Sequence, residues 1–245
     1  MGPSAASLVV VAVAVFAGSA LNALSGFGFA LVTVPIMATV VGPKGAVVLS
    51  ALVGLLSNSG VALRYRADTD RPLAGRLLAG SLVGMPLGLL VLDNVAEDPL
   101  RVAIAVVVLA TAAALAVGWR PPEPSRSADV GAGFVSGLFN TSIGISGPPV
   151  VLLLQAHRVP KGPFRATTAT LFAVAGLVAL ALFGLGGQYT RTVLLSAAVA
   201  LPAWPLGWLV GSRVHRRVPE ERFRLLVLGL MVLTSGIVLA SAVTG

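Results

Sequence analysis

The chain has 245 residues, of which 56% are hydrophobic and only 11% are charged, and its mean hydropathy is +0.95. A soluble domain carries about 25% charged residues, so this composition excludes an ordinary water-soluble globule. The net charge of +8 does not indicate nucleic-acid binding here, because basic loops in a membrane protein mark its cytoplasmic face.

The first half of the sequence contains five apolar segments, at approximately 5–22, 28–42, 45–63, 73–92 and 100–118. A helix needs roughly 20 apolar residues to cross a hydrocarbon core of about 30 Å. Segment 28–42 is shorter than that, and it follows a break at 22–29 that contains two glycines. At 1.5 Å per residue it reaches only about 22 Å.

A stretch rich in proline and charge, 119–129, separates this half from a second set of apolar segments. These lie at about 130–140, 148–157, 166–186, 192–212 and 223–243. The second segment is again short and reaches about 15 Å. We therefore expect the first two segments of each set to form a broken or re-entrant hairpin. Such continuous apolar runs exclude a β-barrel, whose strands alternate polar and apolar residues.

The two halves resemble each other when the sequence is displaced by 117 to 119 residues. Asn22 then matches Asn140, Gly26 matches Gly144, and the tripeptide Pro-Lys-Gly at 43–45 matches the one at 160–162. Both lysines of the chain lie in that tripeptide. The prediction is an all-α polytopic membrane protein with a first transmembrane repeat at 1–118, a cytoplasmic linker at 119–129 and a second transmembrane repeat at 130–245.

The basic residues give the orientation. With five segments in each repeat, fourteen basic residues fall on one face, and only Lys44, Arg101 and Arg191 fall on the other. Cytoplasmic loops carry the excess of Lys and Arg, so both termini are predicted outside and the linker inside. An odd number of segments per repeat makes the two copies inverted, an arrangement that recurs in secondary transporters.

The two breaks, at 22–29 and 140–149, carry the candidate site. A helix that starts after a break directs free N–H groups and the positive end of its dipole at whatever lies before it. Because the copies are inverted, both helix starts are expected to converge near the midplane and to hold a small anion without a buried counter-charge. The predicted substrate-binding residues are Asn22, Ser25, Gly26, Phe27, Gly28, Asn140, Thr141, Ser142, Gly144, Ser146, Gly147 and Pro148.

Other features favour plainer roles. Lys44 and Lys161 are interpreted as anchors at the headgroups, with a vestibule that attracts anions as the alternative. His157 is either a proton-linked switch or a solvated interfacial side chain. The runs Gly80-x-x-x-Gly84-x-x-x-Gly88 and Ala203-x-x-x-Gly207-x-x-x-Gly211 are interpreted as packing seams. The arginines from Arg64 to Arg76 and from Arg213 to Arg224 are interpreted as topology determinants that contact anionic lipid.

Absent groups limit the chemistry. No Asp or Glu lies inside a predicted span, so the acidic relay or sodium cage of many cation-coupled carriers is not expected. The sequence has no cysteine, no cluster of metal-ligating residues and no hydrolase or nucleotide-binding motif. We therefore expect no enzyme activity, no catalytic residue, no metal site and no cofactor.

At the two breaks the sequence resembles the sulfite exporter TauE/SafE family of membrane transporters. The matching residues are Gly26-Phe-Gly-Phe-Ala-Leu-Val-Thr-Val-Pro35 and Gly144-Ile-Ser-Gly-Pro-Pro-Val151. Phe29 stands where many members of the family have a glycine. The resemblance implies export of small anions, such as sulfite, organosulfonates or related sulfur-containing or carboxylate anions, across the bacterial inner membrane.

These observations predict a secondary transporter of small anions that works by alternating access, with membrane lipid as its other partner. Proton coupling, export driven by the membrane potential alone, and a homodimer all stay open at this point. Two other functions also stay open. One is a carrier or channel for a cation or a neutral solute, and the other is a membrane scaffold that transports nothing.

Overall fold

The computed structural model describes residues 2–25, 29–119, 125–214, 228–229, 231–238 and 240. Every regular element in these ranges is helical, in the order α1 (Ala5–Ser25), α2 (Phe29–Arg64), the 3₁₀ turn η1 (Arg66–Asp68), α3 (Arg71–Asn94), α4 (Glu97–Val117), α5 (Arg126–Ser142), α6 (Gly147–Ala156), α7 (Lys161–Leu185) and α8 (Arg191–Val214). The described residues between 228 and 240 are helical as well.

Six helices in the described part of the chain, α1, α2, α3, α4, α7 and α8, are long and apolar enough to cross a membrane. Their lipid-facing sides carry large apolar side chains, among them Val13, Leu63, Val83 and Leu177, each more than 60% exposed. Exposed apolar surface on this scale suits hydrocarbon and not water. The prediction of a helical multi-pass membrane protein is confirmed.

The short segments that the sequence indicated are present. Helix α2 is interrupted at Gly42, which has φ 79° and ψ 159°, a conformation that only glycine adopts without strain. The part of α2 before this kink is therefore a short helix. Its counterpart α6 has 10 residues and ends before Pro160, a residue that cannot continue a helix because it has no N–H.

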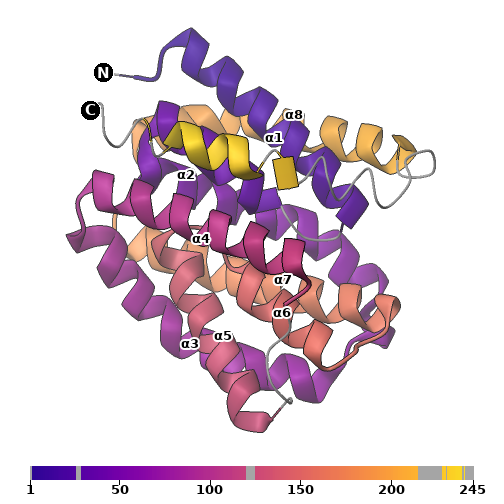
Figure 1. The fold of residues 1–245 in the computed structure, drawn as a ribbon. Coiled ribbons are helices and arrows are strands. Elements are labelled where there is room, and N and C mark those ends of the chain that lie inside the picture. The colour runs from indigo at the N-terminus through magenta and orange to yellow at the C-terminus, as the bar shows by residue number, and fades with distance from the viewer. Residues whose placement is uncertain are drawn as a thin grey trace.

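Two pairs of helices from opposite halves of the chain pack most extensively (Figure 1). Helices α1 and α8 lie side by side at one end of the molecule, and α3 and α5 lie side by side at the other, with α2 against α7 between them. The small-residue seams make these contacts. A Cβ on Gly84 would lie 2.1 Å from the Phe134 carbonyl oxygen of α5, and one on Gly207 would lie 2.2 Å from the Phe16 carbonyl oxygen of α1. The packing role predicted for both runs is confirmed.

Candidate functional site

The break between α5 and α6 lies at 143–146 and is held by two hydroxyl groups. Gly144 has φ 72°, and its carbonyl oxygen accepts a hydrogen bond of 3.3 Å from the Ser50 hydroxyl of α2. The Ser136 hydroxyl of α5 donates to the Ser146 carbonyl oxygen at 2.8 Å. Irregular backbone at membrane depth needs such partners, because lipid supplies none. The break is therefore a fixed part of the structure.

Helix α6 begins at this break, and Pro148 and Pro149 occupy its first turn. Proline is tolerated there because the first N–H groups of a helix have no partner within the helix. Ser146 at the N-cap makes no side-chain cap, and the backbone N–H groups of Ser146 and Gly147 donate no backbone hydrogen bond within the described chain. These donors and the positive end of the α6 dipole are left for another acceptor.

The corresponding break in the first half lies between Ser25, the last residue of α1, and Phe29, the first residue of α2. Gly26, Phe27 and Gly28 lie outside the described residues, as does the side chain of Ser25. What is described is the first turn of α2, in which Phe29 and Leu31 are buried.

A cavity of about 70 Å³ lies between the two breaks. Its lining includes the first residues of α2 and the start of α6, together with the side chains of Asn22, Asn58 and Asn140. One water needs roughly 10–15 Å³ on this measure, so the cavity has room for a few waters or one small oxyanion. Phe29 and Phe172 supply apolar wall.

The polar groups of this cavity are uncharged. Among the described residues that line it, none is Asp, Glu, Lys, Arg or His. Asn140 is 8% exposed, and within the described chain neither its amide nor that of Asn22 has a hydrogen-bond partner. The Asn58 amide donates to the Gly54 carbonyl oxygen at 2.7 Å, which leaves its second N–H. Neutral N–H donors and two helix starts around a small cavity form a surface that suits a negatively charged solute.

The structure brings five of the predicted residues to this cavity. They are Asn22, Asn140, Gly144, Ser146 and Gly147. Three others do not line it: the Thr141 hydroxyl donates to the Met85 carbonyl oxygen at 2.6 Å, the Ser142 hydroxyl donates to the Leu138 carbonyl oxygen at 2.6 Å, and Pro148 is buried in the first turn of α6.

The two lysines lie away from the cavity. The Lys44 ammonium donates to the Asp93 carbonyl oxygen at 3.2 Å, beyond the kink of α2. This contact places Lys44 near the last turn of α3, where a cation is favourable because of the helix dipole. Lys161 is the exposed first residue of α7.

Sequence reasoning missed Ser50 and Asn58, which line the cavity from α2, and Gly176, which lines it from α7. Asn58 had a usable signal, because it stands in the polar triplet Ser57-Asn58-Ser59 within the apolar run 45–63. Polar side chains in the middle of a span are expensive unless they serve a site. Ser50 and Gly176 had no such signal, since only packing brings them together.

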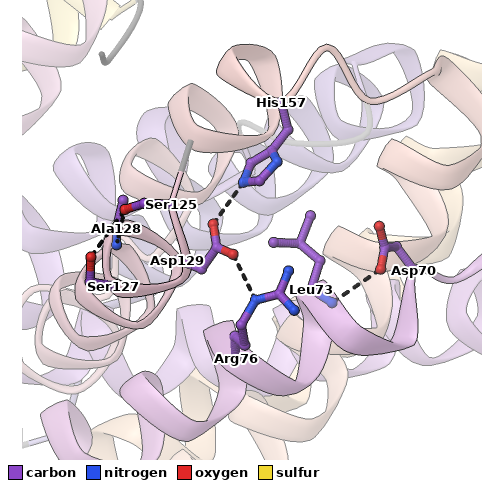
Figure 2. A network of polar contacts seen from close by, with 8 residues as sticks. All are labelled: Asp70, Leu73, Arg76, Ser125, Ser127, Ala128, Asp129 and His157. Atoms are coloured by element: carbon purple, nitrogen blue, oxygen red, sulfur yellow. Dashed lines mark hydrogen bonds and ion pairs between the residues drawn. The ribbon is translucent and has the colours of Figure 1, made fainter. Parts of the chain in front are cut away.

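A buried carboxylate, that of Asp129, lies away from the central cavity. Asp129 was assigned to the linker, but α5 already begins at Arg126, after an N-cap in which the Ser125 hydroxyl accepts from the Ala128 N–H. Asp129 is 1% exposed, and its two oxygens accept from the Arg76 Nε and the His157 Nε2, each at 2.7 Å. Figure 2 shows the carboxylate between these two side chains. Asp129 lies in the first turn of α5, a position that favours a carboxylate because of the helix dipole.

Comparison with known proteins identifies the relatives of the chain. The sequence model of the family described as "Sulfite exporter TauE/SafE" matches residues 10–238. The chain is 27% identical over 229 residues to the "Probable sulfite/organosulfonate exporter TauE" of Cupriavidus necator, a match that covers 88% of this chain and 87% of that protein. It is 28% identical over 131 residues to the "Probable inner membrane transporter protein TsaS" of Comamonas testosteroni, covering 49% and 54%. No solved structure matches significantly.

Proposed function

Because the chain belongs to the sulfite exporter TauE/SafE family, a family of membrane transporters and not of enzymes, we propose that it exports small sulfur oxyanions such as sulfite or organosulfonates across the bacterial inner membrane. The observation that carries this proposal is the cavity of about 70 Å³ in which Asn22, Asn140 and the first turns of α2 and α6 meet. Both relatives are named as transporters.

The chemistry of the cavity supports an anion over a cation. Sulfite and sulfonate oxygens accept hydrogen bonds, and a bond to a charged acceptor contributes about 1.5–3 kcal/mol. The described lining offers amide and backbone N–H donors and contains no carboxylate. A sodium ion needs the opposite set of groups, namely oxygens that face inward.

A neutral cavity also suits turnover. Two helix starts and three amides stabilise the anion without a full positive charge, so that it is held firmly enough to bind and weakly enough to leave. Phe29, which lines the cavity where many relatives have a glycine, narrows the space on the α2 side. We assign Phe29 a role in selecting for a small substrate.

The packing supports alternating access by two inverted repeats. The first helix of each half packs against the helix that forms the fourth apolar segment of the other half, as α1 with α8 and α5 with α3. The central pair, α2 and α7, joins the halves. In this mechanism one half rocks against the other around a fixed site, while the glycine seams keep each cross-pair rigid. The termini lie outside and the linker lies in the cytoplasm.

The membrane potential supplies a driving force for export. Each negative charge that leaves a cell with a negative interior gains about 2.3 kcal/mol per 100 mV. Export therefore requires no ion cage, and the described residues that line the cavity offer none.

The test is transport of sulfite by purified protein in proteoliposomes, with Asn140→Ala as the variant. Removing this amide should lower sulfite flux about tenfold or more, because one hydrogen bond to a charged group is lost. The matched control is Ser142→Ala, two residues along α5, whose hydroxyl bonds only to the Leu138 carbonyl oxygen. We expect the control to transport at close to the wild-type rate.

Three results contradict the proposal. Normal sulfite flux in the double variant Asn22→Ala, Asn140→Ala excludes the cavity as the binding site. Flux that requires sodium and does not depend on which anion is present indicates a cation carrier. A wild-type protein that moves neither sulfite, a sulfonate nor a small carboxylate indicates a scaffold.

A further inference from the structure

A second, smaller cavity of about 10 Å³ lies next to the first, and Arg165 lines it. We propose that Arg165 is the cationic residue that binds the transported anion as it enters or leaves the central cavity. This inference rests on the proposed function. Arg165 is one of the fourteen basic residues predicted to lie on the cytoplasmic face.

The two cavities are neighbours because they share two lining residues. Asn22 of α1 and Asn58 of α2 belong to the lining of both. On the far side of these two amides the small cavity is completed by Val61, Ala169 and Trp208, together with Arg165. Arg165 therefore lines a space that adjoins the central cavity at Asn22 and Asn58.

Arg165 is held in place without being neutralised. Its Cζ lies 5.6 Å from the centre of the Tyr65 ring, a cation–π contact that leaves the positive charge intact. The Arg165 Nε is buried and has no hydrogen-bond partner in the described chain, and no carboxylate of that part lies within ion-pair distance of its guanidinium. A buried N–H without an acceptor is costly, and the planar guanidinium matches two oxygens of one oxyanion.

The position of the charge indicates different roles for Arg165 and for the central cavity. The described lining of the central cavity is neutral, so a nearby cation raises the local concentration of anions without trapping the substrate at the centre. Among the described residues that line the two cavities, Arg165 is the one that carries a full charge. We therefore assign the selection of anions over neutral solutes to Arg165. We assign the selection for a small substrate to the central cavity.

The chain supplies a matched control in Arg64. Its Cζ lies 5.8 Å from the centre of the same Tyr65 ring, so it shares the aromatic contact and the basic surroundings. Arg64 is exposed and lines neither cavity. Neutralising Arg64 therefore changes only the charge of the region. Neutralising Arg165 also removes the charge from the small cavity next to the central cavity.

The experiment measures sulfite efflux from proteoliposomes against internal sulfite concentration for wild type, Arg165→Gln, Arg165→Lys and Arg64→Gln. Arg165→Gln should raise the half-saturating sulfite concentration about tenfold or more, since a charged bidentate contact is lost. The half-saturating concentration of Arg165→Lys should lie between those of wild type and Arg165→Gln, because lysine keeps the positive charge but not the planar guanidinium that contacts two oxygens. Arg64→Gln should stay within about twofold of wild type. The maximal rate should change less than the half-saturating concentration.

Unchanged half-saturation in Arg165→Gln, together with lost flux in Asn140→Ala, overturns the role of Arg165 and leaves the proposed function standing. Wild-type protein that moves neither sulfite nor any other small oxyanion overturns the proposed function itself. If Arg165→Gln does not fold, Arg165→Lys decides the matter, and wild-type half-saturation in that variant counts against the proposal. If Arg64→Gln raises the half-saturating sulfite concentration as much as Arg165→Gln does, the proposal is overturned, because the effect then comes from the overall positive charge of the surface.

Discussion

Asp129 connects three helices through one side chain. It lies on α5, accepts from Arg76 of α3 and accepts from His157, the residue that caps the end of α6. Both partners remain partly exposed, at 31% and 22%. The far end of α6 is thereby tied to the packed α3–α5 pair, while its first turn lines the central cavity. A contact distant from the cavity thus fixes the position of one of its walls.

Replacing Asp129 by Asn should destabilise the protein by about 2 kcal/mol, because a neutral amide leaves one of two charged or polar partners without a matched acceptor. The measurement is the thermal unfolding midpoint of the purified protein in detergent. Asp68→Asn, in the exposed turn η1, is the control and should unfold at the wild-type temperature. Equal midpoints for both variants would show that the three-helix contact contributes no stability.

For single residues, the sequence predicted a role only where that role follows from residues nearby in the chain. Gly144 and Pro148 mark the second break because a glycine at φ 72° and a proline in a first turn follow rules that hold within a few residues. Arg165 and Ser50 gave no such signal, because their positions at the cavities depend on helices far apart in the sequence. The burial of the Asp129 carboxylate gave no local signal either, because it depends on Arg76 of α3 and on His157 at the end of α6.

At the scale of helices, the α3–α5 contact is the closest in backbone approach. Gly80, Gly84 and Gly88 of α3 face carbonyl oxygens of α5, and Gly133 and Gly137 of α5 face carbonyl oxygens of α3. Small residues on both helices let the two backbones meet, which is a main source of helix association where lipid is as apolar as the side chains. The four-residue spacing made this seam predictable, although its partner helix was not.

Gly84→Ala should therefore separate the two helices, since its Cβ would lie 2.1 Å from the Phe134 carbonyl oxygen. We expect a lower unfolding midpoint and a smaller yield of folded protein, with a cost of about 2 kcal/mol. Gly75→Ala is the matched control on the same helix, because no atom lies within 4 Å of its added Cβ. That control should be neutral or stabilising by up to about 1 kcal/mol. Should the two variants unfold alike, the seam is not a tight contact.

For the molecule as a whole, the pairing of helices across the two halves has a topological consequence. If the halves are inverted repeats, the N-terminus and the linker lie on opposite sides of the membrane. The apolar composition and the basic loops made the membrane location and the orientation open to prediction from the sequence. The cross-pairing of α1 with α8 and of α3 with α5 was not, because no local pattern specifies the partner of a seam.

The natural absence of cysteine permits a direct test of this orientation. Single variants Ser4→Cys and Ser127→Cys place one thiol before α1 and one in the first turn of α5, both at exposed positions. In intact cells a membrane-impermeant maleimide should label Ser4→Cys once the outer membrane is opened. It should label Ser127→Cys only after the inner membrane is opened as well. Labelling of both thiols in the same step would reject the proposed topology.

The ten residues of α6 rise about 15 Å, which is roughly half the thickness of the insulating layer. An anion seated at the start of this half-helix has therefore crossed only part of the voltage drop. The electrical work of one complete passage is divided between loading and unloading, and neither step receives the whole of it. A carrier built in this way should show a shallower voltage dependence in either step than an ion that crosses the full barrier in a single jump.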